Sequence, residues 1–109
     1  MAATTLQQVF GANATQTATT VTITKADLSA TGFTPSATNT ADSILAALIA
    51  FAETNIPDAN VTGGNTAQTV GIADGYQQIT TIGTSQFLVL PKTINFYSAF
   101  SETFNPNNY

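Results

Sequence analysis

The clearest pattern in the chain is a run of apolar residues at helical spacing between residues 41 and 54. The large members of this stripe are Ile44, Leu45, Leu48, Ile49 and Phe51. Asn39 or Thr40 can cap the start, and Asp42 lies in the first turn, where the helix dipole favours an anion. Pro57 ends the pattern. These features predict one main helix over residues 41–54.

Alternation with a period of two residues is typical of strands, and it recurs in four places. It predicts strands at residues 19–25, 69–73, 86–90 and 93–98, whereas 76–82 fits either a strand or a short helix. Asp74-Gly75 is a turn dipeptide, and Pro91 marks an edge, a bulge or a break. Residues 29–39 and 57–66 are predicted loops.

These elements predict the α+β class, with the helix packed on one face of a small antiparallel sheet. The threonine face of the first strand is either solvated or covered by a partner. The expected core consists of ten residues: Val21, Ile23, Leu45, Leu48, Ile49, Val70, Phe87, Val89, Ile94 and Phe96.

The two ends of the chain are expected to be extended arms on one domain formed by residues 1–109. In the N-terminal arm, residues 1–18, positions 4–10 fit either a helical turn or an extended segment. The C-terminal arm, residues 99–109, contains Phe100, Phe104 and Tyr109. Chain ends fray by default, but three aromatic side chains favour docking on a neighbouring subunit or on a carrier shell.

The chain has few charged residues, and this makes some classes of partner unexpected. Only 7% of residues are charged, Lys25 and Lys92 are the only cations, and the formal net charge is −4. Nucleic-acid binding and docking on anionic lipid both depend on basic patches, so neither partner is expected. The chain has neither a secretory signal nor a membrane-spanning run, so we expect it to be made and left in the cytoplasm.

The helix is apolar on nearly every side. Ala46, Ala47 and Ala50 occupy positions where polar residues are usual. Alanine is a good helix former on a solvated face, but this face also suits contact with another subunit. On the second interpretation, Ala47→Glu weakens assembly more than it weakens the fold.

Candidate chemistry is sparse. Without His, Cys or Arg the common nucleophile–base pairs are absent, so we predict a protein that is not an enzyme and has no cofactor. Asp42 and Glu53 would lie about 16 Å apart along one helix, too far for glycosidase chemistry. The run from Asp58 to Gly63 begins like a calcium-binding loop but lacks its final Glu, and turn chemistry explains the same residues.

Three short segments carry a resemblance. They are residues 3–11 (ATTLQQVFG), 72–76 (IADGY) and 105–109 (NPNNY), and they resemble small cyanobacterial and cyanophage proteins. The whole chain is similar in length and composition to phage capsid decoration (cement) proteins. This resemblance implies a homotrimer seated on the outside of an icosahedral shell, bound to the major capsid protein, with no catalytic residues.

The function expected from the sequence is therefore a structural virion component, and specifically a capsid cement protein. A tail or neck subunit is the alternative within the same class. A small carbohydrate- or ligand-binding module is the alternative from a different class.

Overall fold

The computed structural model describes residues 3–98 and 103–109. Its helical segments are α1 (Leu6–Phe10), the 3-10 helix η1 (Lys25–Thr31), α2 (Ala41–Asn55), α3 (Asp58–Thr62) and the 3-10 turn η2 (Pro106–Asn108). Its strands are β1 (Thr15–Gln16), β2 (Val21–Thr22), β3 (Val70–Asp74), β4 (Gln78–Ile82), β5 (Ser85–Val89) and β6 (Lys92–Phe96). The predicted α+β class is confirmed.

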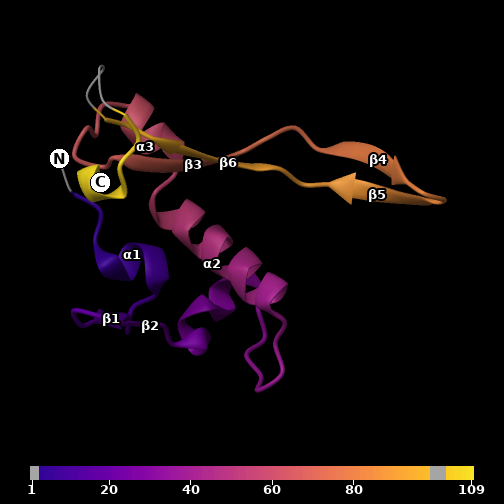
Figure 1. Ribbon diagram of the computed structural model, residues 1–109, viewed down its shortest axis with the longest axis horizontal. Helices are drawn as coiled ribbons and strands as arrows, with labels where there is room; N and C mark the ends of the chain where they lie inside the picture. Colours follow the sequence, from indigo (N-terminus) through magenta and orange to yellow (C-terminus); the bar gives the residue numbers. More distant parts are fainter. Residues whose placement is uncertain (1–2, 99–102) are drawn as a thin grey trace.

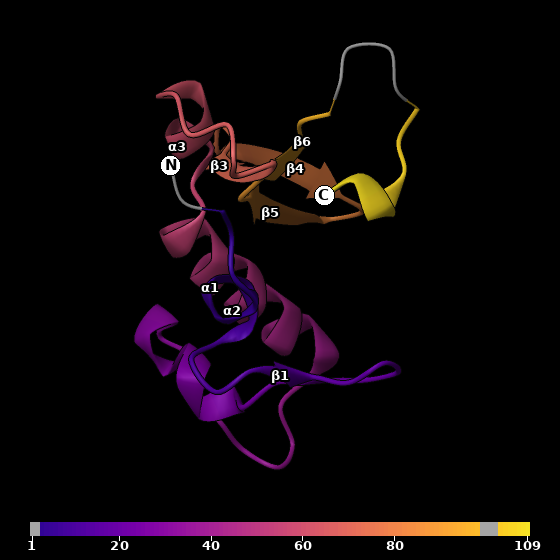
Figure 2. The ribbon, with the colours of Figure 1, turned by 90° about the vertical axis from the view of Figure 1, so that its left-hand side faces the viewer.

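Helix α2 is the central element, and the chain on its N-terminal side wraps around it. Thr40 caps it through a hydrogen bond from the Ser43 amide to the threonine hydroxyl, and the helix extends one residue past the predicted end. Helix α1 lies against α2, as Figure 2 shows, and the Asn55 side-chain amide donates to the Gln8 carbonyl (3.0 Å). The segment before α2 is therefore folded onto this helix.

The N-terminal segment does not form the extended arm that was expected from the sequence. Of the two alternatives for residues 4–10, the helical turn is correct. Thr5 and Gln8 form a reciprocal capping box, in which each side chain accepts from the other residue's backbone N–H. Gly11 ends this turn with φ +115°, and a Cβ there would lie 2.8 Å from the Asp27 Cβ. A larger residue at position 11 would push η1 away.

The predicted strand over residues 19–25 is largely wrong. Only Val21–Thr22 pairs, with β1, in a two-residue hairpin arm. From Lys25 the chain coils into η1, because Asp27 is held by two hydrogen bonds from Asn13, one from its amide and one from its side chain (2.8 and 2.7 Å). This contact fastens η1 to the loop after α1. Leu28, on η1, is the largest fully buried side chain among the described residues.

The remaining strands form one long two-stranded ribbon instead of a single four-stranded sheet. Strand β3 pairs with β6 and β4 with β5, both antiparallel, and the Gly75 amide donates to the Pro91 carbonyl between the two ladders (2.9 Å). The predicted turn at Asp74-Gly75 does not form; the chain reverses at Gly83-Thr84, where Gly83 has φ +64°. Figure 1 shows the distal ladder projecting away from the helices.

The core is small and lies where the end of α2 meets β3. Ala52, Ile56 and Ile72 are buried there, with Val9, Ile49 and Val70 packed around them. The Ile72 amide donates to the Ile56 carbonyl, so the chain leaving α2 adds a bridge to β3. Helix α3, which occupies part of a predicted loop, packs beside the same strand.

None of the ten predicted core residues is fully buried. Ile23, Leu48, Ile49 and Val70 are half-buried, whereas six are exposed: Val21, Leu45, Phe87, Val89, Ile94 and Phe96. The reason is geometric, because α2 meets β3 only near its C-terminal end and no element of the described chain covers the distal ladder.

The chain is poorly compacted for its length. Its radius of gyration is 16.0 Å, whereas a compact domain of this length has about 13 Å. It exposes 7578 Å² of surface, whereas a folded monomer of 11.3 kDa exposes about 5,700 Å². The excess is about 1,900 Å², and large apolar side chains are among the exposed residues.

Candidate functional site

The most conspicuous surface of the described chain is the distal part of the ribbon, residues 75–91, which we call the β-arm. It has no charged residue over its whole length. All of its large apolar side chains except Pro91 are exposed: Tyr76, Ile79, Ile82, Phe87, Leu88, Val89 and Leu90. Ile79 is 71% exposed and Tyr76 95%. Proteins usually protect free strand edges with charges, and the β-arm has none.

Both faces of the β-arm carry apolar groups. Residues opposite each other in an antiparallel ladder share a face, so Ile79 and Leu88 form a pair on one side. Ile82, Phe87 and Val89 lie on the other side, among Gln, Thr and Ser. A two-stranded ribbon alone is at best marginally stable in water. The β-arm therefore suits burial on both faces, and its strands β4 and β5 make their main contacts with each other.

An ion cluster fixes the base of the β-arm to α2. Lys92 Nζ lies 2.6 Å from a Glu53 carboxylate oxygen and 2.5 Å from one of Asp74. The hydrogen bond from Lys92 lowers the pKa of Asp74 below its usual value. The same bond, with a second to Glu53, raises the pKa of Lys92. The other cation, Lys25, donates to the Ser36 carbonyl and to Asn39, so both lysines serve internal contacts.

The pKa directions predict how this cluster depends on pH. Because the pKa of Asp74 is lowered by folding, its contribution to stability is complete above the unfolded pKa and is lost as pH falls through the folded one. Because the pKa of Lys92 is raised, its contribution is lost as pH rises through the folded value. We expect Lys92→Met to move the Asp74 carboxyl titration, followed by NMR, to higher pH. An unchanged midpoint would show that the cluster does not form in solution.

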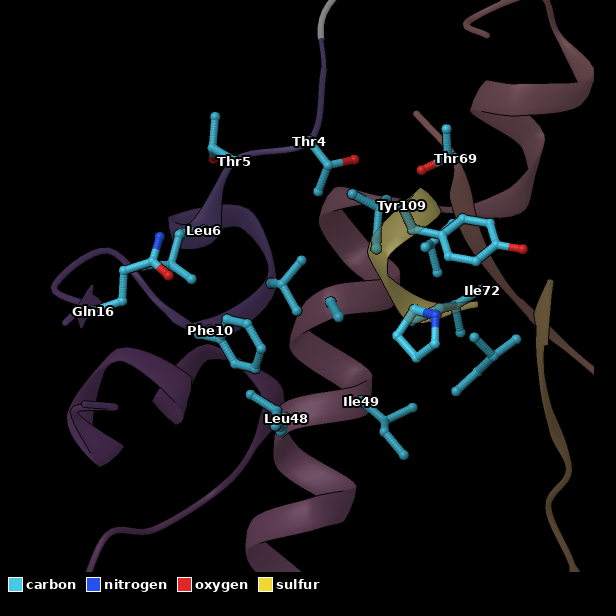
Figure 3. A pocket seen from close by; sticks show the side chains of 16 residues that line it. Thr4, Thr5, Leu6, Phe10, Gln16, Leu48, Ile49, Thr69, Ile72 and Tyr109 are labelled. Atoms are coloured by element: carbon cyan, nitrogen blue, oxygen red, sulfur yellow. The ribbon is translucent and has the colours of Figure 1, made fainter. Parts of the chain in front are cut away.

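A second surface is an open apolar groove between α1, α2, β3 and the C-terminal segment. Its volume is about 680 Å³, and Figure 3 shows it enclosed by Phe10 and Leu48 on one side and by Ile72 and Tyr109 on the other. None of its lining side chains is charged. The Thr4 hydroxyl, which lines the groove, is buried without a hydrogen-bond partner.

The C-terminal segment forms one wall of the groove. Phe104 and Tyr109 pack on Phe96 of the same chain, with ring centroids 5.1 and 5.4 Å from that of Phe96. Asn105 caps η2 by accepting from the Asn107 amide. The C-terminal segment therefore packs on its own chain, although Phe104 remains exposed. Its docking on a neighbour stays a prediction, and Phe100 lies outside the described residues.

The three alanines that were predicted to form one surface of the helix differ in their exposure. Ala47 is only 5% exposed, so its placement on an open helix face was wrong. Residues 31–33 approach α2 at a shallow cleft that Ala46, Ala47 and Ala50 also line, because small side chains admit a close neighbour. Ala46 is exposed and Ala50 half-buried. Contact of these two with another subunit stays a prediction.

The structure does not assemble the calcium loop that was considered from the sequence. The segment is helical, and the carboxylate of Asp58 accepts from the Tyr97 hydroxyl (2.5 Å) and from Asn95 (3.3 Å), while Asn60 turns to Gln68. Within residues 3–98 and 103–109, no three His, Cys, Asp or Glu side chains are grouped to hold a metal ion. The hydrogen bond to Asp58 raises the pKa of Tyr97.

In the described ranges, no helix combines the length and the apolar character that crossing a bilayer requires. Comparisons of the chain with protein-family models, with curated proteins and with solved structures find no match. The function is therefore inferred from the fold and the surface chemistry, and the resemblance to capsid decoration proteins stays a prediction.

The β-arm is the feature that sequence reasoning missed. Two of its apolar residues, Phe87 and Val89, were assigned to a core, because a strand pattern alone does not show what covers the strand. The signal that was available is the absence of charge from residue 75 to residue 91, which is unusual for a ribbon with two free edges.

Proposed function

We propose that this protein is a structural virion subunit, a capsid decoration protein that forms a homotrimer and binds the major capsid protein. The observation that carries the proposal is the surface excess of about 1,900 Å² over a compact monomer of this mass. A standard protein interface takes about 800 Å² from each partner, so the excess corresponds to two interfaces per subunit. A subunit in a ring has two such interfaces, one with each neighbour.

The chemistry of the chain supports a structural role. It has no His, Cys or Arg, so proton transfer and nucleophilic attack lack their usual side chains. Its acidic residues are few, and Asp58, Asp74 and Glu53 are held in internal hydrogen bonds. A large uncharged surface is suited to packing, because association then desolvates no ions.

The test is co-expression with a major capsid protein from the genome that encodes this chain. Assembled shells and unassembled capsid subunits are separated by sedimentation, and each fraction is probed for this chain. We expect it to travel with shells and to be absent from the unassembled fraction. Recovery only in fractions free of shells would contradict a decoration role.

The groove supports a second candidate function, the binding of a small apolar molecule. Ligand sites are typically mostly apolar cavities of about 300–1,000 Å³ with a few polar groups. The groove, at about 680 Å³ and with the Thr4 hydroxyl unpaired, falls in this range. The two functions differ in one observable: a ligand-binding module keeps the groove open in the native protein, whereas the assembly fills it.

A further inference from the structure

The β-arm and the groove are complementary in chemistry and occur once each on the described chain. The β-arm offers exposed aliphatic and aromatic side chains, and the groove is lined by Leu, Ile, Val, Phe and Thr side chains. Neither surface contains a charged side chain. Copies with a net charge of −4 repel one another, so contact is favoured where both surfaces are neutral.

We propose that the β-arm of one copy packs into the groove of a neighbouring copy. The inference rests on the proposed assembly function and names its interface. The β-arm cannot reach its own groove, because the ribbon carries it away from α1 and from the C-terminal segment, as Figure 1 shows. At about 3.3 Å per residue, the stretch from Gly75 to Gly83 is roughly 25 Å long, which is ample to reach across to a second subunit.

The groove lining also contains polar side chains that the β-arm can meet. Gln16 and Thr69 lie among its apolar residues. A two-stranded ribbon presents free backbone N–H and C=O groups along both edges, and amide and hydroxyl side chains can donate to them or accept from them. Packing of the β-arm therefore covers apolar side chains of both partners and leaves polar partners for its edges.

The surface excess favours a second copy of this chain as the occupant. Each subunit carries one β-arm and one groove, so in a ring of three each β-arm can meet the groove of the next copy. Two interfaces of standard size, at about 800 Å² from each partner, would account for most of the excess. A carrier protein bound by the β-arm alone would leave the groove open.

Cross-linking can test this contact directly, because the chain contains no cysteine. Two double variants combine Leu88→Cys on the β-arm with Gln16→Cys or with Thr69→Cys, at different places along the groove. The full chain is treated with a short bis-maleimide and analysed on a denaturing gel. We expect covalent dimers and trimers from at least one double variant, and only monomer from each single variant.

The matched control combines Leu88→Cys with Ala37→Cys, an exposed position in the loop before α2 and not among the groove residues. It should yield no more cross-linked product than the single variants. Light scattering on the same samples separates two failures. If the samples are oligomers but no double variant cross-links the β-arm to the groove, this inference is wrong and the assembly function is not affected. The same holds if the single variant Leu88→Cys cross-links by itself. Monomers overturn both.

Discussion

Removal of the β-arm should convert the protein into a folded monomer. The Gly75 amide donates to the Pro91 carbonyl across the ribbon, so these two residues already lie close together and residues 76–90 can be replaced by a short Asn-Gly link. The ion cluster of Lys92, Asp74 and Glu53 lies outside the deletion. Helix α2 and the Ile56–Ile72 contact also remain. We expect the helical circular dichroism signal to persist while light scattering reports a single copy.

A point substitution provides the same test without shortening the chain. Leu88→Glu places a charge on the exposed β-arm, where an isolated subunit tolerates it. In the assembly that charge would be buried without a partner, which costs about 3 kcal/mol or more, or over a hundredfold in affinity. Ala18→Glu, at the exposed tip between β1 and β2, makes the same charge change as a control. Equal assembly by the two variants would contradict a role for the β-arm.

The same variants distinguish an assembly groove from a ligand site. The arm-deleted monomer leaves the groove open, so it should bind an apolar dye such as ANS, which reports exposed apolar surface. The wild-type assembly should bind much less dye, because the β-arm fills the groove. Equal binding by both proteins would favour the ligand-binding alternative.

Ala47→Glu should strongly destabilise the fold, which reverses the effect predicted from the sequence alone. Ala47 is 5% exposed and lies where residues 31–33 approach α2. A buried, unpaired carboxylate costs about 3 kcal/mol or more, a large part of the 5–15 kcal/mol that stabilises a typical domain. At fixed protein concentration we expect the Tm to fall by at least about 10 °C.

Its neighbour provides the matched control. Ala46 has the same side chain on the same helix but is exposed, so Ala46→Glu should change the Tm of the fold by little. Any effect of Ala46→Glu should appear in the oligomer mass, as expected if this residue meets another subunit. Similar losses of Tm in both variants would show that the N-terminal half of the chain packs on α2 differently from the structure described above.

The elements with the strongest local signals could be predicted from the sequence. Helix α2 was predicted to within one residue of its observed end, because its cap, its stripe and the following proline agree. The strands that became β3 and β6 were also predicted. The first strand failed because Asp27 is recruited by Asn13 in a loop far from it in sequence. A tertiary contact of this kind produces no periodic pattern in the sequence.

The arrangement of the strands could not be predicted, and the candidate site follows from that arrangement. Residues 76–82 fitted either a strand or a short helix, and residues 86–90 indicated a strand that something buries, without indicating which chain buries it. A single-chain interpretation placed Phe87 and Val89 in an internal core. In the structure both side chains are exposed, so two residues that were predicted to lie in the core are now predicted to lie in an interface. The Gly83-Thr84 reversal was missed because Asp74-Gly75 is the stronger turn signal by composition.

In the proposed assembly this chain completes its core with other copies of itself. Light scattering on the unmodified protein, over a wide range of concentration, measures the mass of the native particle. We expect a mass about three times the 11.3 kDa of one chain, maintained on dilution until subunits dissociate. A mass of one chain at every concentration would contradict it, because the β-arm and the groove would then be surfaces that the native protein leaves in water.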